Sequence, residues 1–435
     1  MTTQGKRQKF KPTENLVVSI AGAIVGELYK VDGKGIYFVY DKTWLAQGFN
    51  LSPITMKFDD KPQLAANLQT FNGLHGPFAD SLPDGWGLLL MDRFFNATFG
   101  DGTARTATML DRLAYIGDRG MGAFDYHPKA EHSELSGALS IAELFTASQQ
   151  VYTGETKEVL KQLRIAGGSP GGARPKAVIA LSLDKQEAVS AFGDIPAGYD
   201  HWIIKFRAVD EPIETGAIEY ACAQMARAAG VQMAKSILLE QSMPNGQVER
   251  FFATKRFDRE GDKKRHMMTV AALMYADFRA PTMDYSDLLK LTFVLTKSAA
   301  EVEKMARLMI FNALSHNFDD HTKNFAFLCN EPVQKGEPTH WVFAPAYDIT
   351  FSQARGEHST AFSGHGKPTR KIINELCSDY KFLKPNDYID QTLDALKNWQ
   401  TTFTNANIPH QAGVGIFRTL EQLHKDFEGQ ATRKR

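Results

Sequence analysis

The order of hydrophobic and polar positions at the start of the chain predicts a small antiparallel sheet. Between residues 16 and 41, short β-branched and aromatic runs alternate with the turn signals "AG" and "DGKG". From 78 to 95 and from 107 to 126 the apolar residues recur at helical spacing, and Asp84 stands where a helix N-cap is expected. We therefore expect a β-rich first unit over residues 1–130.

The middle of the chain predicts a second sheet. Apolar runs at 177–183, 201–208 and 250–259 have the composition of strands. The stretch 218–231, which separates the last two runs, has the pattern of a helix. We expect these elements to form a unit over residues 131–265.

Beyond residue 265 the pattern is mostly helical. The stretch 299–318 places Val302, Met305, Met309 and Asn312 on one side of a helix. We expect a helical third unit over residues 266–435, which makes the fold class α+β.

Composition narrows the choice of partners and compartment. Lys plus Arg and Asp plus Glu both total 50 in 435 residues, so no overall charge attracts nucleic acid or an anionic membrane. The three cysteines, Cys222, Cys329 and Cys377, have no CxxC pairing, which argues against a disulfide framework or a zinc ribbon. We find neither a signal peptide nor about 18 consecutive apolar residues, and we expect a cytoplasmic protein without a membrane partner.

A glycine-rich stretch, "GGSPGGARPK" at 167–176, directly precedes the first strand of the middle unit. We call it the glycine loop. Glycines at this density let backbone N–H groups converge on a phosphate, but they are equally common in flexible connectors. On this stretch alone both interpretations stay open.

Two further stretches carry the residues that a kinase needs. In "DDHTKN", which we call the catalytic loop, Asp319 precedes Asn324 by five residues, the spacing at which kinases place a catalytic aspartate and a metal-binding asparagine. The strand-like run "WVFAPAYDIT" then carries Asp348, 24 residues after Asn324, where kinases have a second metal-binding residue. Taken singly, the first pattern also suits a polar turn and the second a helix N-cap.

Lys205 ends a predicted strand, as does the lysine that kinases use to hold the α- and β-phosphates. Glu219, fourteen residues later, is a possible partner, although a solvated helix residue is an equal alternative. Glycine loop, strand lysine, catalytic loop and final aspartate follow one another in the order of a kinase, which predicts a phosphotransferase that uses ATP and Mg²⁺. The glycine loop lacks the G-K-[ST] ending of a P-loop and precedes no typical strand–turn–helix nucleotide unit, which argues against a P-loop protein and against a Rossmann fold.

At this point the chain resembles the HipA family of bacterial serine/threonine kinases, the toxins of HipA–HipB toxin–antitoxin modules. The resemblance rests on the glycine loop and on a series of motifs in one order: "VGEL" (25–28), "LPDGWG" (82–87), "LAYIGDRGMGAF" (113–124), "KRFDR" (255–259), "DDHTKNFAFL" (319–328) and "PAYDI" (345–349). It implies a kinase-like two-lobed fold with an N-terminal β-rich subdomain and a mostly helical C-terminal lobe.

The resemblance also implies site residues. Asp319 corresponds to the catalytic aspartate, and Asn324 and Asp348 correspond to the metal ligands. Ser169 corresponds to the regulatory autophosphorylation site. The implied nucleotide-binding residues are Gly171, Gly172, Ala173, Arg174, Pro175, Lys176, Lys205, the hinge residues Lys255, Arg256 and Phe257, and also His321 and Tyr347.

Two positions depart from the family pattern. Asp320 stands where members often have a glycine, and we expect this extra carboxylate either to raise cation affinity or to face water. The end of the glycine loop is "GGARPK", whereas other members carry a glutamine and an acid before the lysine. The second departure leaves the details of phosphate contact and loop regulation open.

Three functions follow as alternatives. The first is a toxin kinase that phosphorylates itself at Ser169 and a translation component, such as an aminoacyl-tRNA synthetase. It would be neutralised by a helix-turn-helix antitoxin like HipB, through which alone it would reach DNA. The second is a weakly active or silent kinase that acts as a corepressor with that antitoxin. The third is a small-molecule or lipid kinase, since D-x-H-x-x-N also resembles lipid kinase loops.

Overall fold

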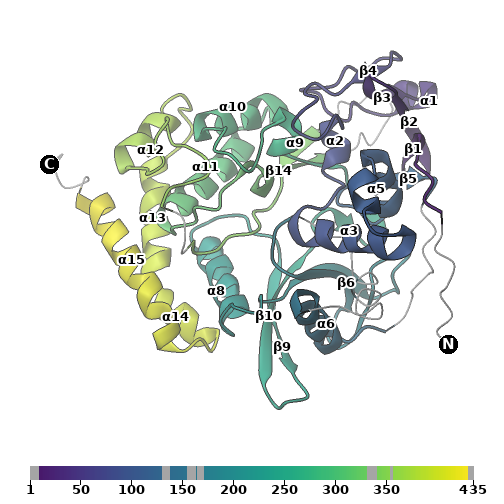
Figure 1. Cartoon of the computed structure of the whole chain (residues 1–435). Helices are drawn as coiled ribbons and strands as arrows, with labels where there is room; N and C mark the ends of the chain where they lie inside the picture. Colours follow the sequence, from purple (N-terminus) through teal and green to yellow (C-terminus); the bar gives the residue numbers. More distant parts are fainter. Residues whose placement is uncertain are drawn as a thin grey trace.

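The protein is represented by a computed structural model, which describes residues 9–129, 138–153, 163, 171–330, 340–352 and 356–429. Figure 1 shows three regions in chain order: strands and short helices near the N-terminus, a second sheet with α8 in the middle, and a group of helices that ends at the C-terminus. In the described part of the chain, no helix has the length and apolar character needed to cross a membrane.

The N-terminal region, residues 9–129, is called the N-terminal unit below. Its sheet is antiparallel with the strand order β4-β3-β2-β1-β5. The strands are β1 (Asn15–Ile20), β2 (Ala23–Val31), β3 (Gly35–Tyr40), β4 (Gln63–Leu64) and β5 (Phe124–His127). Ala21 and Gly22, the predicted "AG" turn, both have positive φ angles, which suits a two-residue hairpin turn.

One part of this unit differs from the predicted pattern. Helix α5 (Met109–Ile116) ends at Gly117, and β5 then pairs with β1 instead of continuing the expected helical stretch to Tyr126. Phe124 and Tyr126 are buried on the core side of the sheet. The partner strand of β5 lies about a hundred residues away in sequence. Because pairing with that strand stabilises β5, the local sequence pattern alone predicts it poorly.

The second sheet is also antiparallel and has the strand order β7-β6-β8-β10-β9. Its strands are β6 (Lys176–Ser182), β7 (Ala188–Ser190), β8 (Tyr199–Lys205), β9 (Ser236–Ser242) and β10 (Val248–Lys255). Helix α6 (Ile141–Thr153) contributes Leu144 and Phe145 to a core with Trp202, Phe206 and Phe251. Helix α8 (Thr215–Ala228) packs against β9 and β10 and joins the main core.

The C-terminal region is mostly helical around a small sheet, β13-β14-β15, formed by β13 (Met267–Thr269), β14 (Ala326–Asn330) and β15 (His340–Phe343). Its helices are α9 (Val270–Met274), α10 (Tyr285–Thr296), α11 (Ala299–Leu314), α12 (Arg370–Cys377), α13 (Pro385–Lys397), α14 (Trp399–Asn405) and α15 (His410–Gly429). The four residues expected on one side of α11 are all buried: Val302, Met305, Met309 and Asn312. The predicted fold class, α+β with a β-rich start and a helical end, is confirmed, while division of the chain at residues 130 and 265 stays a prediction.

A buried ionic cluster joins the second sheet to the N-terminal unit just after β10. Asp258 is fully buried and accepts hydrogen bonds from the guanidinium groups of Arg256 (2.7 and 3.0 Å) and Arg259 (2.9 Å). Gly122 N–H also donates to Asp258, at 2.8 Å. The two arginines in turn donate to the carbonyl groups of Gly120 and Gly122. The stretch "KRFDR" therefore connects two regions of the fold.

Candidate active site

Lys205, the last residue of β8, lies at the centre of a buried ionic cluster. Its ammonium group donates to Glu219 of α8 and to Asp348. The side chains of Lys205 and Glu219 are only 11% and 2% exposed. Burial acts to lower the pKa of Lys205, but Asp348 and Glu219 outweigh it and raise that pKa above its ordinary value. Of the two alternatives left open for Glu219, the structure shows the partner of Lys205 and not the solvated helix residue, and Lys205 is charged at neutral pH.

Asp348 occupies a loop and not the end of a strand. Strand β15 ends at Phe343, and the chain then forms an isolated parallel bridge between Ala346 and Met233. Asp348 has a φ angle of 56°, in the left-handed region. Burial alone would raise the pKa of its carboxyl, but Lys205 and Lys176 lower it well below the usual range. The predicted site aspartate is therefore ionised and beside the predicted phosphate lysine.

The catalytic loop is held by one hydrogen bond within it and one from Tyr347, which lies outside it. The side-chain amide N–H of Asn324 donates to the backbone carbonyl of Asp319 at 2.7 Å, which leaves the amide oxygen as the group that can accept a cation. The hydroxyl of Tyr347 donates to the carbonyl of Lys323 at 2.6 Å. Tyr347 precedes Asp348 and Lys323 precedes Asn324, so this bond ties together the segments that carry both predicted metal ligands.

The described part of the glycine loop, residues 171–176, approaches the same cluster. Arg174 donates to Glu211 at 2.7 Å and to Glu219 at 3.3 Å. The ammonium group of Lys176 donates to the carbonyl of Gly171. Burial is the main cause that lowers the pKa of Lys176 to about 8, and the nearby charge of Lys205 also contributes. Ser169, the predicted modification site, lies outside the described residues.

The predicted hinge residues are used in three different ways. Lys255 pairs with Asp200 at 2.6 Å, and the guanidinium of Arg256 belongs to the buried cluster around Asp258. Phe257 packs against Tyr347, with ring centroids 5.5 Å apart. Phe257 therefore contacts the residue directly before Asp348. A nucleotide-binding role for the hinge stays a prediction. The ring of His321 lies 5.7 Å from that of Phe278 in the same region.

The structure contradicts one of the two alternatives expected for Asp320, and an effect on cation affinity stays a prediction. The residue is 1% exposed and therefore does not face water. Its carboxylate accepts hydrogen bonds from the Tyr285 hydroxyl (2.7 Å), the backbone N–H groups of Ser359 (2.8 Å) and Thr360 (3.2 Å), and interacts with His358 Nδ1 (2.8 Å). With these partners the carboxylate is directed into the protein interior, where it anchors the catalytic loop to the segment around residue 359.

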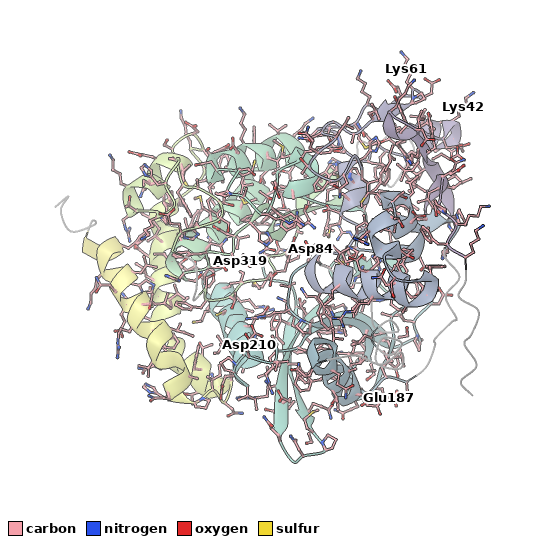
Figure 2. All side chains as sticks on the ribbon, viewed as in Figure 1. Lys42, Lys61, Asp84, Glu187, Asp210 and Asp319 are labelled. Atoms are coloured by element: carbon pink, nitrogen blue, oxygen red, sulfur yellow. The ribbon has the colours of Figure 1, made fainter. Side chains whose placement is uncertain are left out.

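Two residues at the site were missed as functional candidates. Asp84 occupies the N-cap position of α3 (Gly85–Phe99), but its side chain makes no capping bond. It accepts instead from Lys323 Nζ at 2.8 Å and from the backbone N–H of Gly172. Figure 2 shows Asp84 and Asp319 in the middle of the molecule, between the N-terminal elements and the C-terminal helices. The position of Lys323 directly before Asn324 was the available signal in the sequence.

The donor atoms fit a magnesium ion that is shared with phosphates. Asn324 and Asp348 offer an amide oxygen and a carboxylate, the hard oxygen ligands that Mg²⁺ prefers, and kinases complete the coordination with phosphate oxygens and water. Among the described residues, no group of three or more His, Cys, Asp and Glu side chains is arranged to hold a metal ion by itself. The two oxygen donors therefore fit the cation predicted from the sequence, and their use of it stays a prediction.

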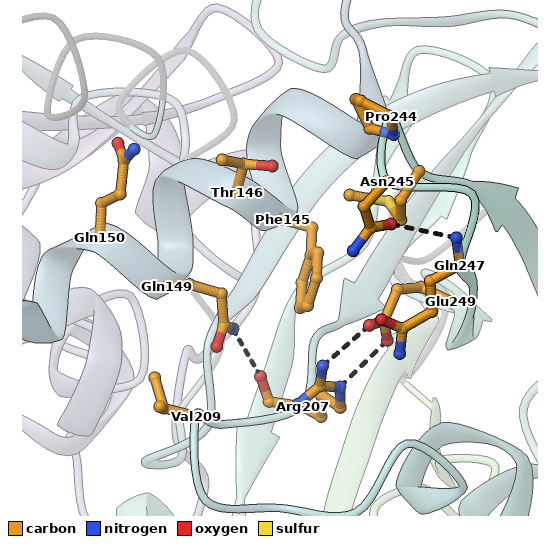
Figure 3. Close-up of a pocket in the computed structure, with 11 residues that line it drawn as sticks. Phe145, Thr146, Gln149, Gln150, Arg207, Val209, Pro244, Asn245, Gln247 and Glu249 are labelled. Atoms are coloured by element: carbon orange, nitrogen blue, oxygen red, sulfur yellow. Dashed lines mark hydrogen bonds and ion pairs between the residues drawn. The ribbon is translucent and has the colours of Figure 1, made fainter.

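One described pocket lies away from the cluster around Lys205. It has a volume of about 440 Å³ and is formed by α6, the segment after β8, and the β9–β10 hairpin. Figure 3 shows Phe145 at its centre and the ion pair of Arg207 with Glu249 along one wall. The guanidinium of Arg207 makes two hydrogen bonds with the carboxylate of Glu249. None of the lining residues is one of the predicted site residues. This pocket therefore adds no group to the cluster around Lys205.

Comparison with known proteins agrees with this architecture. Residues 168–403 match the family model described as the HipA-like C-terminal domain, and residues 16–127 match that of the HipA N-terminal domain. A HipA structure from Shewanella oneidensis, solved with HipB and operator DNA, is similar with a TM-score of 0.66. Its sequence identity is 16%, and the match covers 95% of this chain and 96% of that one.

A more distant structural match is the proinflammatory kinase CtkA of Helicobacter pylori. Its TM-score is 0.36 at 13% identity, over 54% of this chain and 85% of that one. Among curated proteins, none matches the sequence significantly. The two family models together span most of the chain, and the protein belongs to the HipA family.

Proposed function

We propose that this protein is an ATP- and Mg²⁺-dependent serine/threonine protein kinase that acts in the cytoplasm as the toxin of a toxin–antitoxin pair. The observation that carries the proposal is the contact of Lys205 with both Glu219 and Asp348, next to the catalytic loop. Three charged groups from three separate segments meet here. Lys205 and Glu219 are buried and Asp348 is 31% exposed, and burying charge is costly unless a function or a strong ion pair compensates. A kinase needs these residue types in this combination.

Each residue has a defined role in this proposal. Lys205 holds the α- and β-phosphates of ATP, and Glu219 keeps its ammonium group in place. Asp319 accepts the proton of the attacking hydroxyl while the hydroxyl oxygen bonds to the γ-phosphorus and the bond to the bridging oxygen breaks. Asn324 and Asp348 would hold Mg²⁺, which supplies positive charge to the phosphates. The amides and cations of the glycine loop cover the phosphates.

The proposed partner is a small helix-turn-helix antitoxin. The similar Shewanella protein was solved together with HipB and operator DNA, which supports a partner of this kind. The chain has 50 basic and 50 acidic residues, so we place DNA contact mainly on the antitoxin. We propose a translation component, such as an aminoacyl-tRNA synthetase, as the phosphorylated target, and Ser169 as a site of inactivating autophosphorylation.

The experiment that tests the proposal is incubation with labelled ATP and Mg²⁺, alone and with a bacterial lysate, followed by mass spectrometry of labelled sites. We expect label on Ser169 and on a lysate protein. Label only in a lipid or metabolite would replace the proposal by a small-molecule kinase. An absence of label on every component would replace it by a silent corepressor.

Isosteric variants test the assigned residues in the same assay. We expect D319N and D348N each to lower the phosphotransfer rate about a thousandfold or more, or ~4 kcal/mol of barrier, because each removes an essential charge. Asparagine keeps the side-chain shape and tolerates the positive φ at residue 348. The matched control is D379N, at an exposed position after α12, which should behave as the wild type. Activity of either site variant within about threefold of the control would show that the site is misassigned.

A further inference from the structure

The start of α3, in the N-terminal unit, is hydrogen-bonded to one residue of the glycine loop, Gly172. The carboxylate of Asp84 accepts from the backbone N–H of Gly172, and the backbone N–H of Trp86 donates to the carbonyl of Gly172 at 3.1 Å. Both backbone polar groups of Gly172 are thereby used by the N-terminal unit. The glycine loop leads into β6 of the second sheet. These hydrogen bonds to Gly172, however, come from the N-terminal unit.

Glycines make this close approach possible. Gly85 has a φ angle of 45°, and a Cβ atom there would lie 2.5 Å from the carbonyl oxygen of Gly172. A Cβ atom at Gly171 would lie 2.8 Å from the carboxylate oxygens of Asp84. Side chains at these two positions would push the segments apart. Gly85 of "LPDGWG" and Gly171 of the glycine loop therefore both allow the same close contact between these two segments.

The same carboxylate reaches the catalytic loop. Lys323 Nζ lies 2.8 Å from Asp84 Oδ2, and both side chains are largely buried. Burial acts to raise the pKa of Asp84, but the charge and hydrogen bond of Lys323 and the N–H of Gly172 lower it overall. An ionised Asp84 thus joins three segments that are far apart in sequence: the start of α3, the glycine loop and the catalytic loop.

We infer that Asp84 is a positioning residue of the nucleotide site, through which the N-terminal unit holds the glycine loop against the catalytic loop. This inference rests on the proposed kinase function. A glycine-rich segment has many accessible conformations, and ordering it at the moment of ligand binding costs free energy. Contacts that order the loop beforehand reduce this cost and strengthen nucleotide binding. The N-terminal unit is then part of the catalytic apparatus.

The test compares full-length D84A and D84N with D92N. Asp92 lies on the same helix and pairs with Arg112 at 2.6 Å, away from the glycine loop, so D92N controls for a general weakening of α3. We expect D84A to weaken Mg²⁺-ATP binding about tenfold in calorimetry, since it removes a charge-assisted bond to the loop. D84N should lie between D84A and wild type, because its amide oxygen still accepts from Gly172 but does not pair with Lys323.

A second measurement does not depend on ATP. Hydrogen exchange of a peptide that covers residues 171–176 should be faster in D84A than in D92N without any ligand. Adding K323M to D84N should weaken ATP binding less than K323M does in the wild type, because the ion pair is already lost.

Failure of this inference and failure of the proposed function give different results. A wild type that does not bind Mg²⁺-ATP would contradict the proposed kinase function. Unchanged exchange of the loop peptide in D84A would overturn the inference, whatever the affinity. Tighter ATP binding by D84A would also overturn it, because the carboxylate would then compete with the nucleotide phosphates for the loop.

Discussion

Replacing Asp258 by asparagine should destabilise the protein strongly, although Asp258 is not one of the proposed catalytic residues. This carboxylate is fully buried and neutralises Arg256 and Arg259 together. Burial alone would raise its pKa, but the two guanidinium groups lower that pKa well below the ordinary range. D258N keeps an acceptor for Gly122 N–H and leaves two buried cations without a counter-charge.

The size of the effect can be worked out from this cluster. Removing one partner of a buried ion pair costs about 3–5 kcal/mol, and one carboxylate here serves two cations, so we expect about 4 kcal/mol or more. At ~2.1 cal/mol/K of unfolding entropy per residue, 4 kcal/mol lowers the melting temperature by about 4 °C if all 435 residues unfold together. If only residues 16–127 unfold, the same loss corresponds to about 17 °C.

The assay is thermal and urea denaturation of D258N beside D390N. Asp390 pairs with Arg370 at 2.7 Å but is 65% exposed, and its loss should cost less than about 1 kcal/mol. The reasoning would be refuted if D258N and D390N had unfolding free energies within about 1 kcal/mol of each other. In that case the ion pairs of Asp258 with Arg256 and Arg259 would not offset the desolvation cost of burying these charges.

Two predictions concern pH. Asp80 accepts from Thr269 N–H (2.6 Å) and its hydroxyl (2.8 Å), and burial raises the Asp80 pKa from 3.8 to about 6, so its contribution to stability is present below pH 4 and lost as pH rises through 6. D80N should therefore gain stability relative to wild type between pH 4 and 7, by up to about 3 kcal/mol, and parallel urea stability curves would contradict this. Lys176, with its pKa near 8, should gain a proton when a phosphate binds. Calorimetry of Mg²⁺-ATP binding at pH 8 in two buffers of different ionisation enthalpy should show proton uptake, which K176M should abolish; equal wild-type heats would contradict it.

Elements with a strong local pattern could be predicted from the sequence. Strands β6 and β8 and helices α8 and α11 lie within a few residues of their predicted positions, because each combines a clear apolar periodicity with a turn or cap signal. The Lys205–Glu219 pair was one of two alternatives that these elements left open, since a short connection can bring a lysine at a strand end close to a glutamate on the next helix.

Contacts across long sequence separations could not be predicted in this way. Asp84 and Lys323 are 239 residues apart, and Asp258 and Gly122 are 136 residues apart. The N-cap pattern around Asp84 is correct for the backbone and wrong for the side chain, because a buried cation and a loop amide compete with the helix for the same carboxylate. Asp320 was misjudged for a similar reason, since its partners come from residues far along the chain.

The left-handed backbone at Asp348 limits how this position can change over evolutionary time. Such a φ angle is easiest for glycine and costs asparagine and aspartate less than most side chains, although Lys185 and Lys297 of this chain also adopt one. A carboxylate ligand, on the other hand, comes only from aspartate or glutamate. Aspartate meets both requirements best, so under the proposed function we expect residue 348 to stay aspartate. Under the proposed function, we expect a related protein with glycine or asparagine at this position to keep the fold and to lack phosphotransfer.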